Sequence, residues 1–362
     1  MNIDFTSLPK NFQDAVTVTR GLGVKYLWID ALCIVQDDMD DWEKESGKMT
    51  SVYHNAHLVL GADMSEDAHG GFLEREGNPY AGKEAPIAMI DSTRATIHAR
   101  WHRLHWNPCA ILGDFPKKEP EPLSKRAWTL QEQMLASRMV HFAREELIWE
   151  CDSALSCECM ELDRGISDKN ERPRYRKALD SPSADMFTLW YRVIINFSNR
   201  SITKLSDRLP ALSGLAQHFQ THGAGPYLAG LWHNDLPRGL LWTSSIAENS
   251  FRVDPYRAPT WSWASIESQH RYDVNLLHTE AELQRVYADI LDAKCYAAGG
   301  DSCGAVKGGW IKIRAPMFEI VYRESWWYHR KAKDTQSSIR VEFDFRFTPT
   351  EEEVLSCLLV AL

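Results

Sequence analysis

The sequence predicts an α/β fold with a central, partly parallel sheet and flanking helices, followed by a helical segment and a β-rich C-terminal region. Residues 26–35 are nearly all apolar, which is typical of a strand buried on both faces of a parallel sheet. A helical pattern over 41–55 and a second apolar stretch over 57–62 complete a β-α-β unit. From residue 308 onward the pattern changes to short strands.

Composition and charge narrow the class of protein. The chain has 362 residues, of which 44% are hydrophobic and 25% are charged, as in globular proteins. A net charge of -9 argues against a nucleic-acid backbone or an anionic membrane surface as the main partner. The N-terminus lacks the pattern of a signal peptide, and eight cysteines spread over the chain indicate reduced thiols. We therefore expect a cytoplasmic protein that binds neither nucleic acid nor membranes.

The predicted elements follow in order along the chain. Asp40 and Glu43 resemble a capping box, which begins the helix that runs to about Asn55. Further helices are expected over 124–136, 186–197 and 207–219. Strands are expected over 139–142, 147–149, 310–313, 318–322, 339–347 and 354–362.

Glu45 lies on the apolar stripe of the helix predicted over 41–55. At helical spacing this stripe contains Trp42, Met49, Val52, Tyr53 and Ala56. A carboxylate there must be paired, or its pKa must shift. The sequence leaves two interpretations open: a catalytic glutamate that lines a pocket, or a structural ion pair with an arginine such as Arg126.

Asp30 interrupts the apolar run, and Gln36 follows where that run ends. Near the carboxyl end of a parallel strand, Asp30 would face the crevice in which α/β sheets bind ligands. Alternatively, it caps a neighbouring helix or accepts hydrogen bonds from backbone N–H groups.

Arg126, Gln131 and Glu132 form a second polar set. Arg126 has the geometry to clamp a phosphate or carboxylate through two hydrogen bonds. It would equally neutralise Glu45 or Asp30 inside the fold, and we favour such a structural network.

The cysteines give no complete metal-binding motif. Cys151, Cys157 and Cys159 have C-x5-C-x-C spacing, but zinc takes four ligands and no close histidine completes the set. His102 and His105 lack an accompanying motif. We therefore predict no metal site, since buried free thiols are common. The absence of G-x-G-x-x-G and Walker sequences likewise predicts no conventional dinucleotide or P-loop cofactor site.

Several motifs resemble those of one family. Residues 28–37 (WIDALCIVQD) resemble the WID-x-LCI-x-Q signature of the fungal heterokaryon-incompatibility (HET) family, and the match continues to residue 56. Residues 126–132 (RAWTLQE) resemble its R-G-W-T-x-Q-E motif, with Ala127 where glycine is usual. Residues 206–216 (SDRLPALSGLA) and 258–265 (APTWSWAS) fit longer relatives. In the last block, Trp261 and Trp263 alternate with Ser262, so both indole rings would lie on one face of a strand. We expect these rings to pack in the core rather than to form an aromatic platform for a ligand.

The resemblance implies a division of the chain into three regions. Residues 1–160 correspond to the HET domain without its usual first strand and LS-x-x-WG loop. Residues 161–268 correspond to a helical HET-associated region, and residues 269–362 to a β-rich C-terminal region. Because the chain ends inside an apolar run, we expect C-terminal strands to be missing as well.

The resemblance also implies a function: self/non-self recognition and the programmed cell death that follows fusion of genetically unlike hyphae. Such a module works through association with other proteins or with itself and needs no cofactor. The HET fold is also remotely similar to the Toll/interleukin-receptor (TIR) fold, some members of which cleave NAD with a glutamate. By that analogy Glu45 would stabilise the cationic ribose, and Asp30 or Gln36 would hold ribose hydroxyls.

The two hypotheses predict different surroundings for Glu45. An enzyme that cleaves NAD should have Glu45 in a cavity with converging polar groups. A module that acts by association should have Glu45 in an ion pair and an exposed apolar patch elsewhere.

Overall fold

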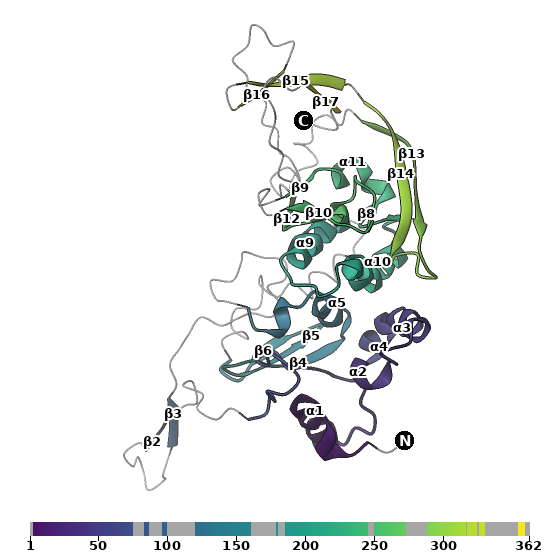
Figure 1. The fold of residues 1–362 in the computed structure, drawn as a ribbon. Helices are drawn as coiled ribbons and strands as arrows, with labels where there is room; N and C mark the ends of the chain where they lie inside the picture. The colour runs from purple at the N-terminus through teal and green to yellow at the C-terminus, as the bar shows by residue number, and fades with distance from the viewer. Residues whose placement is uncertain are drawn as a thin grey trace. The chain divides into compact units, whose positions relative to one another are not determined.

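The chain folds into two compact units, Met1–Arg176 and Lys177–Leu362, each of which is described by itself. A computed structural model describes residues 3–74, 83–86, 96–99, 120–160, 179, 185–244, 250–272, 288–315, 317–323, 326–329 and 354–358 (Figure 1). The finer division at residues 160 and 268 stays a prediction. Among the described residues, no helix has both the length and the hydropathy needed to cross a bilayer.

The first unit contains short helices and a mixed sheet. Its four-stranded sheet has the order β1-β4-β5-β6, in which β1 and β4 are parallel and the other pairs are antiparallel. The predicted α/β class with a partly parallel sheet is therefore confirmed. The elements are η1 (Phe5–Ser7), α1 (Lys10–Gly21), α2 (Asp30–Cys33), α3 (Met39–Ser46), α4 (Met49–Asn55), β1 (Val59–Gly61), β2 (Lys83–Pro86), β3 (Thr96–Ala99), η2 (Leu123–Lys125), α5 (Trp128–Leu135), β4 (Arg138–Phe142), β5 (Leu147–Cys151) and β6 (Leu155–Cys157).

The strand predicted over 26–35 is wrong. Its second half forms the single helical turn α2, in which the N–H groups of residues 32–34 bond to the carbonyls of Ile29 and Asp30. Tyr26 and Val35 are 88% and 53% exposed, so the run is not buried on two faces. The apolar composition predicted burial, but a buried strand needs neighbours on both sides, and residues 26–35 belong to no sheet in the described part of the chain.

The helix predicted over 41–55 is two helices. Gly47 and Lys48 separate α3 from α4. Glycine inside a helix is less favourable than alanine by about 1 kcal/mol, which explains a break at this position. Glu45 and Tyr53 therefore lie on different helices.

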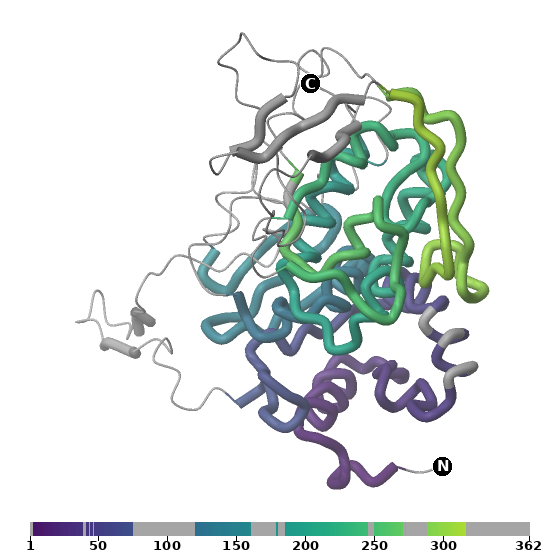
Figure 2. Tube along the Cα trace, turned by 45° about the horizontal axis from the view of Figure 1, so that its top comes forward, coloured from purple at the N-terminus to yellow at the C-terminus, as the bar shows by residue number. Residues whose placement is uncertain are grey.

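Helix α1 packs on the sheet through small and aromatic side chains. Ala15 contacts Phe72 and Phe142, whose rings lie 4.6 Å apart. The carboxylate of Asp14 is also buried, and it accepts hydrogen bonds from the N–H groups of Phe72 and Leu73 at 2.8 and 3.2 Å. One helix thus closes the apolar core and fixes the loop after β1; Figure 2 shows this purple N-terminal part beside the blue strands.

A buried histidine joins three segments of the sheet. His141 on β4 bonds through Nδ1 to Asp63 at 3.0 Å and through Nε2 to Glu150 on β5 at 2.9 Å. All three side chains are at most 2% exposed. Burial alone would lower the pKa of His141, but the two carboxylates outweigh burial and raise it from 6.5 to about 9. His141 is therefore an imidazolium that neutralises charge inside the fold, and both its ring nitrogens are occupied.

The second unit is built around tryptophans. Trp190, Trp232 and Trp263 are fully buried, and the indole N–H groups of Trp190 and Trp263 both donate to the carbonyl of Gly230, at 2.8 and 3.1 Å. Gly230 has φ +98, and a Cβ there would lie 2.4 Å from the Trp263 ring. Only glycine fits this backbone conformation next to the Trp263 indole without strain.

Helices predicted in the second unit are confirmed, with changed ends. The elements are α9 (Met186–Ser198), η3 (Leu205–Arg208), α10 (Pro210–Thr221), β7 (Tyr227–Leu228), β8 (Leu231–Trp232), η4 (His233–Asp235), α11 (Leu236–Gly239), β9 (Trp242–Ser244), β10 (Phe251–Arg252), η6 (Trp263–Ser265), β11 (Ile266–Glu267) and β12 (His270–Tyr272). The strand expected around Trp261 is wrong, because Trp263 starts the 3-10 helix η6. Its ring is nevertheless in the core, as expected.

The C-terminal part is β-rich, as predicted. A long hairpin pairs β13 (Asp289–Ala297) with β14 (Val306–Arg314), and it is the yellow-green ribbon of Figure 1. A second sheet joins β15 (Met317–Arg323) to β16 (Trp326–His329) and β17 (Val354–Leu358). The strand predicted over 339–347 lies outside the described residues, as do His102 and His105.

The raised pKa of His141 predicts a pH-dependent stability. A group whose pKa is higher in the folded state stabilises that state fully below its unfolded pKa, near 6.5, and loses this effect as pH rises through about 9. The free energy of unfolding should fall by on the order of 3 kcal/mol between these values. Urea unfolding at a series of pH values measures it, and Glu150→Gln should flatten the slope. A stability that stays constant over this range would contradict the prediction.

Candidate functional site

Charged side chains from three other segments act on the hydroxyl of Tyr53. Tyr53 lies on α4, which packs against α5 and is tied to the segment after it by a hydrogen bond from Ser137 Oγ to the carbonyl of His54 at 3.1 Å. The Tyr53 hydroxyl bonds to Glu132 on α5, and the charges of Asp30 and Arg126 act on it as well. We call Asp30, Tyr53, Arg126 and Glu132 the Tyr53 cluster.

The electrostatics of this cluster keep Tyr53 protonated. Burial of the hydroxyl raises its pKa well above the usual 10, and the negative charges of Glu132 and Asp30 raise it further. Arg126 opposes these effects by lowering the pKa. Tyr53 is therefore a hydrogen-bond donor at neutral pH and not a nucleophile or a base.

The local sequence explains where Asp30 and Gln36 lie. The prediction that Asp30 stands near the end of a strand is wrong. Asp30 is the exposed first residue of α2, and its carboxylate accepts a hydrogen bond from the N–H of Ala31 at 2.7 Å. Gln36 Nε2 donates to the carbonyls of Ile34 and Asp30 at 2.9 and 3.3 Å. Gln36 thus holds the turn that carries Asp30.

The residues of the second polar set, Arg126, Gln131 and Glu132, do not all lie on the same side of α5. The hydroxyl of Thr129 bonds to the carbonyls of Leu123 and Arg126 at 2.8 and 2.7 Å, which fixes the start of the helix. Arg126 is exposed, Glu132 is half-buried, and Gln131 is fully buried. Arg126 and Glu132 therefore belong to the Tyr53 cluster, whereas Gln131 points into the interior.

Glu45 has a neighbour that the sequence did not indicate. Its carboxylate forms an ion pair with Lys48 at 2.6 Å, and its side chain is 20% exposed. The predicted structural partner was Arg126, whose charge acts instead on Tyr53. Since Lys48 lies in the break between α3 and α4, the pair closes the end of α3 locally.

The cluster has the chemistry to hold a polar ligand. Arg126 can bind an anionic group, and the carboxylates of Asp30 and Glu132 can accept bonds from hydroxyls. Trp28 packs edge-to-face on Tyr53 with ring centroids 5.8 Å apart, and Trp42 packs in the same way on Trp128 at 6.3 Å. Metal-ligating side chains of the described residues converge elsewhere, at Glu146, Cys157 and Cys159.

Comparison with known families identifies this part of the chain. Residues 1–132 match the family model described as Heterokaryon incompatibility protein (HET). The chain carries a HET domain. The match contains every member of the Tyr53 cluster and ends at Glu132. No curated protein and no solved structure matches the chain.

The family match confirms the resemblance on which the sequence interpretation rests. The fungal origin and the missing terminal segments of the HET domain stay predictions, as do the binding roles of Asp30, Gln36, Arg126, Gln131 and Glu132. Sequence reasoning placed Tyr53 on an apolar stripe and did not assign it to a site. A tyrosine on such a stripe needs a partner for its hydroxyl, and this was the signal that could have found it.

Replacing Tyr53 with phenylalanine should destabilise the HET domain by about 1–3 kcal/mol, because the bond to a charged acceptor is lost. Chemical unfolding measures this difference. Tyr26→Phe is the matched control, since Tyr26 is 88% exposed and its loss should change stability by less than about 0.5 kcal/mol. Equal effects of the two substitutions would show that the Tyr53 cluster contributes nothing to the fold.

Proposed function

We propose that this HET domain is a self/non-self recognition module that promotes cell death by associating with a second copy of itself. The observation that carries the proposal is an exposed apolar segment at residues 22–35. Its large side chains include Tyr26, 88% exposed, and the exposed Leu22, Leu27, Leu32 and Val35. Consecutive apolar residues at the surface of a folded domain mark a site of interaction.

The backbone of this segment supports association by strand pairing. Ile29 is extended, with φ -134 and ψ 124. Among the described residues, no backbone hydrogen bond reaches residues 25–28. Backbone N–H and C=O groups without backbone partners, as at residues 25–28, are a template for the addition of another strand.

Charge complementarity favours a second copy as the occupant. Lys25 and Asp30 stand at opposite ends of the segment, and both are exposed. Antiparallel pairing of two copies about a two-fold axis would place Lys25 of each copy opposite Asp30 of the other. Opposite charges across a strand pair contribute roughly 0.2–1 kcal/mol.

The ion pair of Glu45 with Lys48 supports the same proposal, since a module that acts by association needs no free carboxylate at this position. The proposal includes a cytoplasmic location and involves neither nucleic acid nor a membrane.

Disrupting the segment should abolish self-association. Tyr26→Asp should weaken it by about tenfold or more, as loss of a central aromatic anchor does, in sedimentation experiments over a range of protein concentrations. Lys25→Asp should weaken it, and the charge exchange Lys25→Asp/Asp30→Lys should restore it. Tyr256→Asp is the matched control, since Tyr256 is similarly exposed but lies outside the HET domain.

The same variants test the link to cell death. Induced expression in a filamentous-fungus host should reduce viability, Tyr26→Asp should remove this effect, and the charge exchange should restore it. A chain that stays monomeric and still kills would contradict self-association and point to another partner protein. A chain that self-associates and leaves cells viable would contradict the role in cell death.

The Tyr53 cluster favours a second function, cleavage of NAD by a TIR-like mechanism. The observation behind it is that the charges of Asp30, Arg126 and Glu132 all act on one hydroxyl, since nucleotide sites need several polar groups. Glu45 would then stabilise the ribose cation, after leaving its ion pair with Lys48.

NAD consumption by the purified chain tests this second function. If Glu45 is catalytic, Glu45→Gln should abolish turnover, whereas Lys48→Gln breaks the same ion pair and should preserve it. Chromatography of the nicotinamide released measures both. Equal turnover in the three proteins, or none in the folded unmodified chain, would exclude Glu45 as a catalytic residue.

A further inference from the structure

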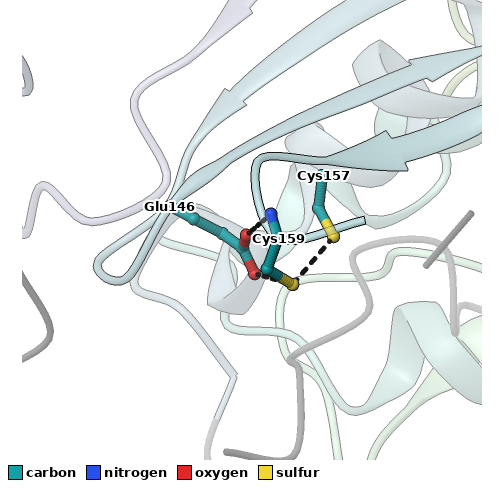
Figure 3. Close-up of side chains that lie close together, drawn as sticks. All are labelled: Glu146, Cys157 and Cys159. Carbon is teal, nitrogen blue, oxygen red and sulfur yellow. Dashed lines mark hydrogen bonds between the residues drawn. The ribbon is translucent and has the colours of Figure 1, made fainter. Parts of the chain in front are cut away.

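Two cysteines and a glutamate meet beside the β4–β5 hairpin. Glu146 belongs to the turn between β4 and β5, whereas Cys157 ends β6 and Cys159 follows it (Figure 3). One ligand atom from each side chain lies within 4.8 Å of the other two. We propose that Glu146, Cys157 and Cys159 bind a zinc ion. The sequence predicted no metal site at the C-x5-C-x-C spacing, and Glu146, which lies outside that spacing, would supply the third ligand.

A tight turn brings the two thiols together. The N–H of Met160 bonds to the carbonyl of Cys157 at 2.9 Å, and Met160 has φ 62. Both residues between them are anchored to the hairpin: Glu158 accepts a bond from the N–H of Leu147 at 3.0 Å, and Cys159 donates its N–H to Glu146 Oε2 at 3.0 Å. The backbone thus holds the three side chains in place without help from a metal.

The distances match those around a tetrahedral zinc ion. Bonds of about 2.3 Å to sulfur and about 2.1 Å to oxygen separate two sulfurs by about 3.8 Å, and sulfur from oxygen by about 3.6 Å. Here the Cys159 sulfur lies 3.6 Å from Glu146 Oε1 and 3.3 Å from the Cys157 sulfur. Both distances lie within about half an ångström of the tetrahedral values.

The ligand atoms and their apolar surroundings favour a metal ion of borderline softness, such as zinc. Cys157 lies in an apolar cluster with Ala143, Ile148 and Leu155, and Glu146 is also buried. Two sulfurs and one oxygen suit zinc, whereas magnesium and calcium require oxygen ligands. Cys159 is half-buried, which gives the ion access and leaves the fourth position to water. Binding would release the two thiol protons.

Two other roles for the thiols make different predictions. A disulfide requires the sulfurs to approach to about 2.05 Å, and 3.3 Å is a non-bonded distance. Simple packing of Cys157 as a small apolar residue predicts no affinity for zinc and no effect of zinc on the two thiols.

Titration of the full reduced chain with Zn²⁺ tests the proposal. One equivalent should bind, with the loss of two thiols accessible to reagent. Cys157→Ser and Cys159→Ser should each weaken binding by at least the roughly 10–100-fold that loss of an outer partner costs. Glu146→Gln should weaken it in the same direction. Cys151→Ser and Glu145→Gln are the matched controls, since both residues are outside the cluster.

Substitution with Co²⁺ gives a second readout that does not depend on stability. A thiolate-to-cobalt charge-transfer band should form in the unmodified chain and be lost in Cys157→Ser/Cys159→Ser, whose folding is checked by circular dichroism. Zinc binding that is unchanged in this double variant would overturn the proposal. So would mass spectrometry of the freshly purified chain that shows a Cys157–Cys159 disulfide resistant to exchange.

Discussion

The sheet of the HET-containing unit depends on one charged interaction, the imidazolium of His141 held between Asp63 and Glu150. Each member comes from a different place: the loop after β1, β4 and β5. Removing either carboxylate leaves one buried ring N–H of the imidazolium without its hydrogen-bond acceptor, which costs about 1–3 kcal/mol. There is also no room for a side chain at residue 61, since a Cβ at Gly61 would lie 2.6 Å from the Asp63 carboxylate.

The contacts of His141 also influence the position of the Tyr53 cluster, because short connections join the sheet to the helices that carry Tyr53 and Glu132. Three residues separate the end of α4 from β1, so the position of β1 beside β4 sets where Tyr53 can lie. Helix α5 precedes β4 by two residues and carries Glu132. The hydroxyl of Tyr53 therefore meets Glu132 because the parallel β1–β4 pair brings their two helices side by side. The HET family match covers the helices and β1 but ends before β4 and β5, so the buried histidine lies outside the matched residues.

Sequence reasoning succeeded where structure is decided locally. The β4–β5 pair and α9 follow from period and turn signals within a few residues. It failed where burial depends on distant neighbours: the apolar run at 26–35 indicates a strand, yet nothing in the sequence shows that it lacks pairing partners. The partner of Glu45 was available from the sequence, since Lys48 lies three residues on and such residues are neighbours in a helix. Asp63 meets His141 through the parallel β1–β4 pair, whereas Glu150 meets His141, and Glu146 meets the two cysteines, through the antiparallel register of β4, β5 and β6.

The exposed segment at residues 25–28, whose backbone makes no backbone hydrogen bond within the described part of the chain, also bears on how the protein behaves at high concentration. Unpaired strands with apolar side chains recruit any compatible chain, including partly folded copies, and can nucleate cross-β stacking. In natural domains a lysine on such an edge often prevents pairing with another chain. Here Lys25 stands at one end of the segment, and the apolar Tyr26 and Leu27 follow it with no charged residue between them. A charged residue in place of Tyr26 should therefore raise the concentration at which the chain stays dispersed.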